Sequence, residues 1–95
     1  MPAYILAELD VFDSVRFEEY KKLAAAAVER YGGRYVARGG RVEELEGSWS
    51  PKRLVILEFS TTEQARAWWH STEYEAAKAV RRECARSKFI LVEGV

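Results

Sequence analysis

Arg38 is the side chain of this 95-residue chain that is best placed to bind an anion. It stands directly before Gly39–Gly40, inside a stretch that reads as a β-strand. Glycine within a strand marks a bulge or the close approach of a ligand or another backbone. A guanidinium there can hold a carboxylate or an enolate oxygen through two parallel hydrogen bonds. The alternative is a structural arginine at a strand edge, paired with Glu43, Glu44 or Glu58.

Glu58 and His70 are the two candidates for moving protons. Glu58 lies in an otherwise apolar run, where burial would make its carboxylate a general base. Its alternative is an ion pair with Arg38 or Arg53, or a glutamate in water at the end of a strand. His70 is the only histidine, and imidazole exchanges protons near neutral pH. Its alternative is a structural position near a helix C-terminus, which the helix dipole favours.

Three aromatic side chains complete the candidate binding site: Tyr20, Trp69 and Tyr74. Aromatic residues at helical spacing usually belong to a core, and this is the alternative for all three. Tyr20 stands apart because the phenol of a half-buried tyrosine needs a partner and can orient a substrate oxygen. Cys84 is expected to be a small core residue, since nothing near it in sequence activates a thiol.

The composition excludes several classes of partner. Fifteen basic and fifteen acidic residues cancel, so no long-range field attracts nucleic acid or an anionic membrane. The third apolar strand lacks the aromatic pattern of an RNA-binding sheet, and no apolar run is long enough to span a membrane. A single cysteine rules out an internal disulfide, and no phosphate-binding loop or zinc spacing is present. We expect a cytoplasmic protein without cofactor or metal, with haem on one axial histidine as an alternative.

Hydrophobic periodicity and turn residues divide the chain into strand, helix, strand, strand, helix and strand. Strands are predicted at residues 4–11, 34–46, 53–59 and 88–93. The first helix starts at Asp13 or Ser14 and ends at Gly32, a residue type that commonly closes helices. The second begins with the capping box of Ser60 and Glu63, is broken near Ser71, and continues to residue 86.

This order predicts one domain over residues 1–95, of the α+β class. Right-handed crossovers on either side of a central hairpin give a ferredoxin-like βαββαβ fold, with a four-stranded antiparallel sheet and both helical segments on one face. The runs at 54–57 and 89–92 are apolar at every position, although a sheet with one wet face should alternate. The face without helices therefore needs a cover. We expect a homodimer whose sheets pack face to face.

Several short motifs occur in this order: Pro2-Ala3-Tyr4, Glu19-Tyr20, Tyr31-Gly32-Gly33-Arg34-Tyr35, Arg38-Gly39-Gly40, Glu46-Gly47, Pro51-Lys52-Arg53, Glu58-Phe59, Ala65 with Trp68, Ser71 with Glu73-Tyr74, and Ser87. Together they resemble the domain-of-unknown-function 1330 family, in the dimeric α+β-barrel superfamily. The resemblance implies a ferredoxin-like subunit that dimerises through its sheet. It implies no particular reaction, because the family has no established one. Relatives in the superfamily include cofactor-free monooxygenases, isomerases, dehalogenating enzymes and haem-handling proteins, with pockets between sheet and helices.

The function expected from the sequence is a small-molecule pocket that catalyses proton transfer or oxygenation of an acidic organic substrate without a bound cofactor. In this hypothesis Arg38 binds the anion, Glu58 or His70 moves protons, and Tyr20 orients the substrate. The alternative is a non-catalytic ligand-binding or structural homodimer, in which Arg38 and Glu58 pair and fix the strand register.

Overall fold

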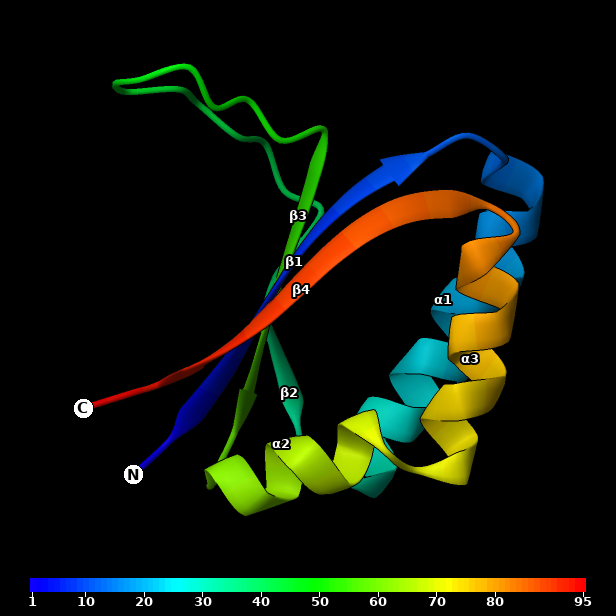
Figure 1. The fold of residues 1–95 in the computed structure, drawn as a ribbon, viewed down its shortest axis with the longest axis vertical. Coiled ribbons are helices and arrows are strands. Elements are labelled where there is room, and N and C mark those ends of the chain that lie inside the picture. Colours follow the sequence, from blue (N-terminus) through cyan, green and yellow to red (C-terminus); the bar gives the residue numbers. More distant parts are fainter.

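A four-stranded antiparallel sheet with three helices on one face forms the framework of the protein; the computed structural model describes all 95 residues (Figure 1). The strand order is β2-β3-β1-β4, which confirms the predicted ferredoxin-like fold. The elements are β1 (Ala3–Val11), α1 (Ser14–Arg30), β2 (Arg34–Arg38), β3 (Arg53–Phe59), α2 (Thr62–Trp69), α3 (Thr72–Arg82) and β4 (Ala85–Glu93).

Local side-chain caps account for the ends of the helices. The carboxylate of Asp13 accepts a hydrogen bond from the backbone N–H of Arg16 at 3.1 Å and starts α1. Gly32, with φ of 76°, follows its last turn, as predicted. The predicted break in the second helical segment is also present, because the Ser71 hydroxyl caps α3. The helix α2 starts one residue later than the capping box predicts: its N-cap is Thr61, not Ser60.

Alternation along the strands divides the sheet into an inner face toward the helices and an outer face away from them. The inner side chains of β1 are Ala3, Ile5, Ala7 and Leu9, all at most 4% exposed. On the outer face, Ile56, Leu6 and Ile90 stand side by side across β3, β1 and β4. The outer face thus carries an apolar row that no helix covers, as the unbroken apolar runs predicted.

The second strand is much shorter than predicted: it ends at Arg38 instead of residue 46. Gly39 has φ of 69°, which turns the chain out of the sheet, and no strand lies opposite the residues that follow. Residues 39–52 form a long connection, exposed except at Pro51, that projects on the side away from the helices (Figure 1). It includes Leu45, which is 90% exposed, and Trp49, whose indole N–H donates to Glu8 on the outer face at 3.3 Å.

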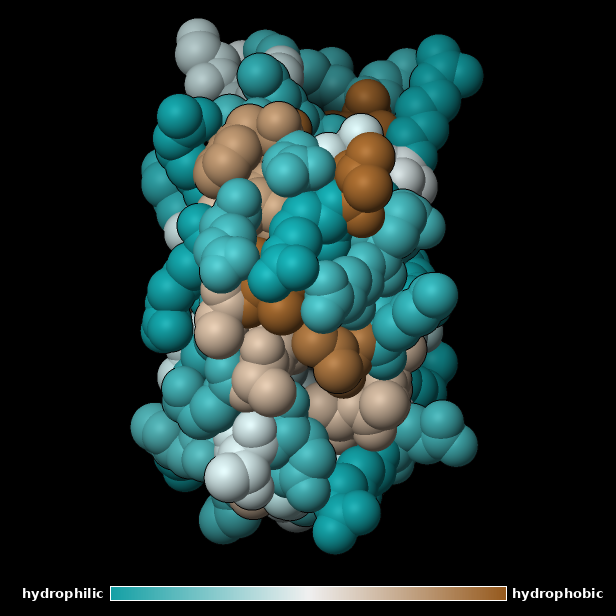
Figure 2. All heavy atoms as spheres, turned by 90° about the vertical axis from the view of Figure 1, so that its right-hand side faces the viewer, coloured by the Kyte–Doolittle hydropathy of each residue, from teal (hydrophilic) through white to brown (hydrophobic).

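The helix side presents a mainly hydrophilic surface with small hydrophobic areas between the polar side chains (Figure 2). This is the surface expected of amphipathic helices that bury one stripe against a sheet. Neither α1 nor the two shorter helices are long and apolar enough to cross a membrane.

Candidate functional site

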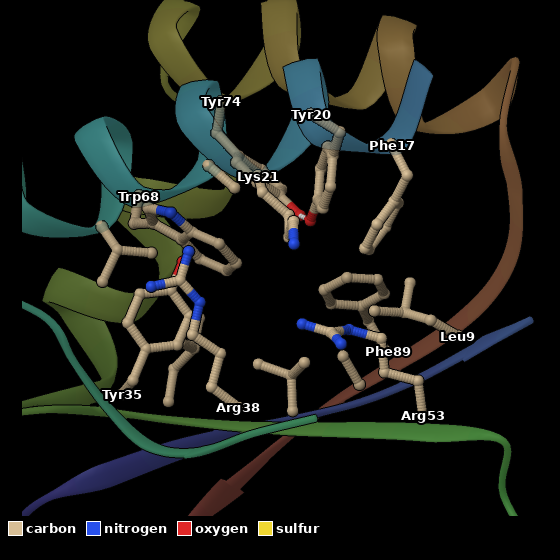
Figure 3. Close-up of a pocket in the computed structure, with 15 residues that line it drawn as sticks. Leu9, Phe17, Tyr20, Lys21, Tyr35, Arg38, Arg53, Trp68, Tyr74 and Phe89 are labelled. Carbon is tan, nitrogen blue, oxygen red and sulfur yellow. Dashed lines mark hydrogen bonds between the residues drawn. The ribbon is translucent and has the colours of Figure 1, made fainter. Parts of the chain in front are cut away.

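A cavity lies between the helices and the inner face of the sheet (Figure 3). Its volume is about 30 Å³, and because one water molecule needs about 10–15 Å³, it has room for about two or three. Twelve of the fifteen residues that line it are hydrophobic; the lining consists of Ala7, Leu9, Phe17, Tyr20, Lys21, Ala24, Val28, Tyr35, Arg38, Arg53, Val55, Leu57, Trp68, Tyr74 and Phe89. The other three lining residues, Lys21, Arg38 and Arg53, are all cations.

A bulge in β2 brings Arg38 to this cavity. In a regular strand Tyr35 and Arg38 would point to opposite faces, because side chains alternate. The pairing with β3 shifts between Tyr35 and Ala37, so that Tyr35 lies opposite Leu57 and Arg38 opposite Val55, both inner-face residues. The extra residue therefore puts Arg38 on the helix side of the sheet together with Tyr35. The guanidinium of Arg38 lies 4.3 Å from the centroid of the Tyr35 ring.

Arg53 is the second guanidinium at the cavity, and it enters from the start of β3 (Figure 3). Its carbon Cζ lies 5.3 Å from the centroid of the Phe17 ring, and its Nε is buried without a hydrogen-bond partner. Neither Arg53 nor Arg38 forms an ion pair with a protein carboxylate. The expected alternative, in which Arg38 pairs with Glu58, is not the arrangement observed.

The predicted close approach at Gly39–Gly40 involves only the first glycine, and the group that approaches is Arg53. A Cβ atom at Gly39 would clash with Nη1 of Arg53, whereas a Cβ at Gly40 would meet nothing within 4 Å. The predicted bulge is also displaced, because it lies between Tyr35 and Ala37. Gly39 therefore serves both to end β2 and to let the Arg53 side chain pass into the cavity.

Gly39→Ala should lower the free energy of unfolding by about 1–2 kcal/mol, because alanine is strained at a left-handed φ, and should also displace Arg53. Gly40→Ala is the matched control, since Gly40 has no positive φ and no close neighbour. It should change stability by less than about 0.5 kcal/mol. Urea unfolding of both variants measures the difference; equal losses would contradict the role assigned to Gly39.

Lys21 is the third cation, and it reaches the cavity from α1 (Figure 3). Its ammonium forms an ion pair with Glu18 at 2.7 Å, one helical turn earlier. The hydrogen bond from Lys21 holds the pKa of the Glu18 carboxyl below its usual value. Glu18 itself is exposed and does not line the cavity. The positive charges at the cavity wall therefore outnumber the one carboxylate beside them.

A buried hydrogen-bond chain forms the helix side of the cavity. The hydroxyl oxygens of Tyr20 and Tyr74 are 2.8 Å apart, and Nη1 of Arg81 donates to the Tyr74 oxygen at 2.7 Å. Tyr74 is fully buried, and burial raises the pKa of its phenol above the usual value, so it stays neutral. The structure therefore places Tyr20 and Tyr74, two of the three predicted aromatic binding residues, at the cavity.

The structure does not bring the other three candidates to the cavity. Glu58 lies on the outer face, where Arg34 forms an ion pair with it and the Tyr4 hydroxyl donates to it at 3.0 Å. His70 is exposed at the C-terminal end of α2, which offers no enclosed position for a haem ligand. Trp69 packs behind the wall, with its ring 5.2 Å from that of Phe89, and lines a separate shallow groove at the edge of β4.

Arg53 and Lys21 were missed as site residues, although the sequence contains a signal for each. Arg53 is two and four residues from Val55 and Leu57, which places it on the same face of β3. Lys21 directly follows Tyr20, at the border of the apolar stripe of α1. The charge of Lys21 predicts a solvated side chain, and Arg53 enters the sequence-based prediction only as a possible ion-pair partner of Glu58.

The profile of a family described as Domain of unknown function (DUF1330) matches residues 2–95. A comparison with curated proteins gave no match. Among solved structures, the chain is similar to RPA0582 of Rhodopseudomonas palustris, a protein of unknown function, with a TM-score of 0.80 and 17% identity over 99% of this chain and 82% of that one.

Two further structures share the fold. SnoaB of Streptomyces nogalater, a cofactor-independent oxygenase, has a TM-score of 0.68 and 13% identity over 99% of this chain and 93% of that one. A dimeric protein of unknown function and ferredoxin-like fold from Bacteroides fragilis has a TM-score of 0.70 and 13% identity over 98% and 96% of the two chains. The sequence match covers nearly every residue and the structural similarity supports the same fold, so the chain belongs to the DUF1330 family.

Proposed function

We propose that this domain binds a small organic anion in the cavity between its helices and its sheet. One observation carries the proposal: the charged side chains that reach the cavity are all cations, and Arg38 and Arg53 have no protein carboxylate as a partner. Arg53, which is half-buried and has a buried Nε without a partner, is costly beside apolar walls when it lacks a counter-charge. A ligand carboxylate, enolate or phenolate oxygen supplies that charge and accepts hydrogen bonds from the cations.

The rings around the cavity favour a ligand that is flat as well as anionic. Phe17, Tyr35 and Phe89 contribute aromatic surface, and the two arginines already lie over aromatic rings. The volume of about 30 Å³ is too small for such a ligand with the side chains in their present positions. Arg38 is exposed and Lys21 partly so, and both side chains are flexible. We propose that they turn outward to admit the ligand and close over its anionic group.

We further propose that the domain is a cofactor-free enzyme acting on an acidic substrate, by proton transfer or oxygenation. Both reactions pass through a carbanion or enolate, whose oxygen the cations and the Tyr20 hydroxyl would stabilise. In an oxygenation of this type, a CH₂ group and O₂ give a C=O group and water, and the substrate supplies all the electrons. The structural similarity to SnoaB, itself a cofactor-independent oxygenase, supports this choice.

Neither Glu58 nor His70 is placed to transfer protons in this reaction. Glu58 is separated from the cavity by the sheet, and His70 lies exposed at a helix end. The wall contains no carboxylate or imidazole that could take a proton. A substrate that reacts here must therefore enter already as an enolate or phenolate, which limits it to phenols and β-dicarbonyl compounds and favours oxygenation over proton transfer, which needs a base.

A second candidate function is a structural homodimer without a ligand site, and the small volume of the cavity favours it. Isothermal titration calorimetry with benzoate and its neutral analogue benzamide separates the two. If the cavity binds an organic anion, benzoate should give heat of binding and benzamide should give none. Arg38→Met should weaken benzoate binding by about 10- to 100-fold, as expected for the loss of a charge-assisted hydrogen bond.

Arg34→Met is the matched control for this experiment. Arg34 is on the same strand as Arg38 and carries the same charge, but it faces the outer side and binds Glu58. It should leave benzoate affinity within about twofold of the wild type. If benzoate and benzamide bind equally well, or if neither binds, the anion-binding function is refuted and the structural homodimer is the function that stands.

We propose that the domain works as a homodimer whose two sheets pack through their outer faces. The support is the uncovered apolar row of Ile56, Leu6 and Ile90, continued by the exposed Val92 and Val36. A stable interface buries about 800 Å² on each partner, and a sheet face of this kind is a suitable surface. The similar protein from Bacteroides fragilis is dimeric. The connection at residues 39–52 projects on this side and would flank the partner (Figure 1).

A further inference from the structure

The direction of the hydrogen bonds in the buried chain is set by Arg81. A guanidinium can only donate, so the Tyr74 oxygen accepts from Arg81 at 2.7 Å. The proton of Tyr74 then needs an acceptor, and the one oxygen within reach is that of Tyr20, at 2.8 Å. If Tyr20 donated to Tyr74 instead, the Tyr74 proton would be orphaned in a fully buried position. Burying a donor without a partner is costly, which favours donation from Tyr74 to Tyr20.

This direction leaves the proton of Tyr20 free for a ligand. Tyr20 has no other hydrogen-bond partner in the protein, and its hydroxyl points toward the centre of the cavity (Figure 3). Donation along a chain that starts at a cation strengthens each following donor. The hydroxyl of Tyr20 is thus a polarised donor, on the side of the cavity opposite Arg38 and Arg53 (Figure 3).

Arg81 is itself a buried cation without a counter-ion. It is 6% exposed, forms no ion pair with a carboxylate, and has a buried Nε without a partner. Aromatic rings surround it, with its Cζ 4.4 Å from the centroid of Phe89. An uncompensated buried charge beside a cavity is explained if the ligand provides the negative charge. The positive charge of Arg81 acts on the ligand through the hydrogen bonds that connect Tyr74 and Tyr20.

We propose that Tyr20 donates the hydrogen bond that orients the bound oxyanion, and that Arg81 is a positioning residue acting through Tyr74. This inference rests on the proposed anion-binding function and adds to it which proton meets the ligand and what fixes its direction. It also narrows the ligand class to molecules whose anionic oxygen, held by the guanidinium groups, can accept from a phenol on the opposite wall. A ligand with only donors at that end would be rejected.

A double-mutant cycle with benzoate as the probe tests this inference. Tyr20→Phe and Arg81→Met should each weaken benzoate binding about 10-fold. The double variant should be no more than about twofold weaker than Tyr20→Phe, because Arg81 acts only through the lost hydroxyl. Arg81→Lys retains a donor and should restore affinity to within about threefold of the wild type. If Arg81→Met weakens benzoate binding by the same factor in the wild type and in Tyr20→Phe, its role is structural and the inference is overturned.

Tyr74→Phe provides an independent cycle in case Arg81→Met does not fold. It removes the connecting hydroxyl while retaining the ring, and should weaken benzoate binding only when Tyr20 is present. If the losses of benzoate affinity in Tyr74→Phe and Tyr20→Phe are additive in free energy, the hydrogen-bond chain from Arg81 through Tyr74 to Tyr20 is contradicted. The two proposals fail differently: a wild type that does not bind benzoate refutes the anion site, whereas binding with additive cycles refutes only the roles of Tyr20 and Arg81.

Discussion

Trp68→Ala is expected to lower the free energy of unfolding by about 3–5 kcal/mol, the usual cost of removing a large aromatic ring from a core. Trp68 is 1% exposed and packs between Phe59, at 5.4 Å between ring centroids, and Tyr74, at 4.2 Å. Since a domain of this kind is stable by about 5–15 kcal/mol in total, the variant should be only marginally folded. Urea unfolding at one fixed protein concentration measures the change.

Trp69→Ala is the matched control, because the two tryptophans are neighbours on α2. Trp69 is only partly buried, and one side of its ring is covered by the ammonium of Lys78, 3.8 Å from the ring centroid. Its removal should cost about 1–2 kcal/mol, in keeping with the smaller area taken from water. A loss for Trp69→Ala as large as that for Trp68→Ala would show that the core is centred elsewhere.

Ile90→Glu is expected to convert the proposed dimer into a monomer without unfolding it. Ile90 is 62% exposed in the single chain, so a charged residue there should change the stability of the subunit by less than about 0.5 kcal/mol. In the proposed dimer the same position lies in the apolar row, where an unpaired carboxylate would be desolvated. Light scattering at micromolar concentration should give the mass of two chains for the wild type and of one chain for the variant.

Val15→Glu makes the same chemical change on the helix side. Val15 is 84% exposed on α1, outside the proposed interface, so this variant should remain a dimer. A monomeric wild type, or dissociation of both variants alike, would contradict the sheet-to-sheet arrangement. The pair therefore distinguishes a specific interface from a general effect of added negative charge.

The fold was predictable because its signals are local or periodic. The apolar stripe of α1, the uniform apolar run of β3 and the capping serine at residue 71 each depend on a few neighbouring side chains. The order of these elements leaves few topologies once right-handed crossovers are required. The apolar outer face was also visible in the sequence, because β3 and β4 do not alternate as a half-exposed strand should.

The end of β2 and the placement of the bulge were not predictable, because both depend on pairing with β3. Residues 40–46 were predicted to continue the strand, but no strand lies opposite them. The bulge is at Val36, a residue type that gives no sign of one, and not at the two glycines. A one-residue shift in pairing moves every following side chain to the other face, so it decides where Arg38 points.

The sequence by itself determined the topology, the helical stripes and the candidates Arg38 and Tyr20. Only the tertiary structure decided which polar groups meet. It separated Glu58 from the cavity because even and odd positions of β3 face opposite sides, and it brought in Arg53 for the same reason. It also joined Arg81, Tyr74 and Tyr20, whose positions lie on two different helices. Such contacts depend on how elements pack, and no local pattern of residues encodes that.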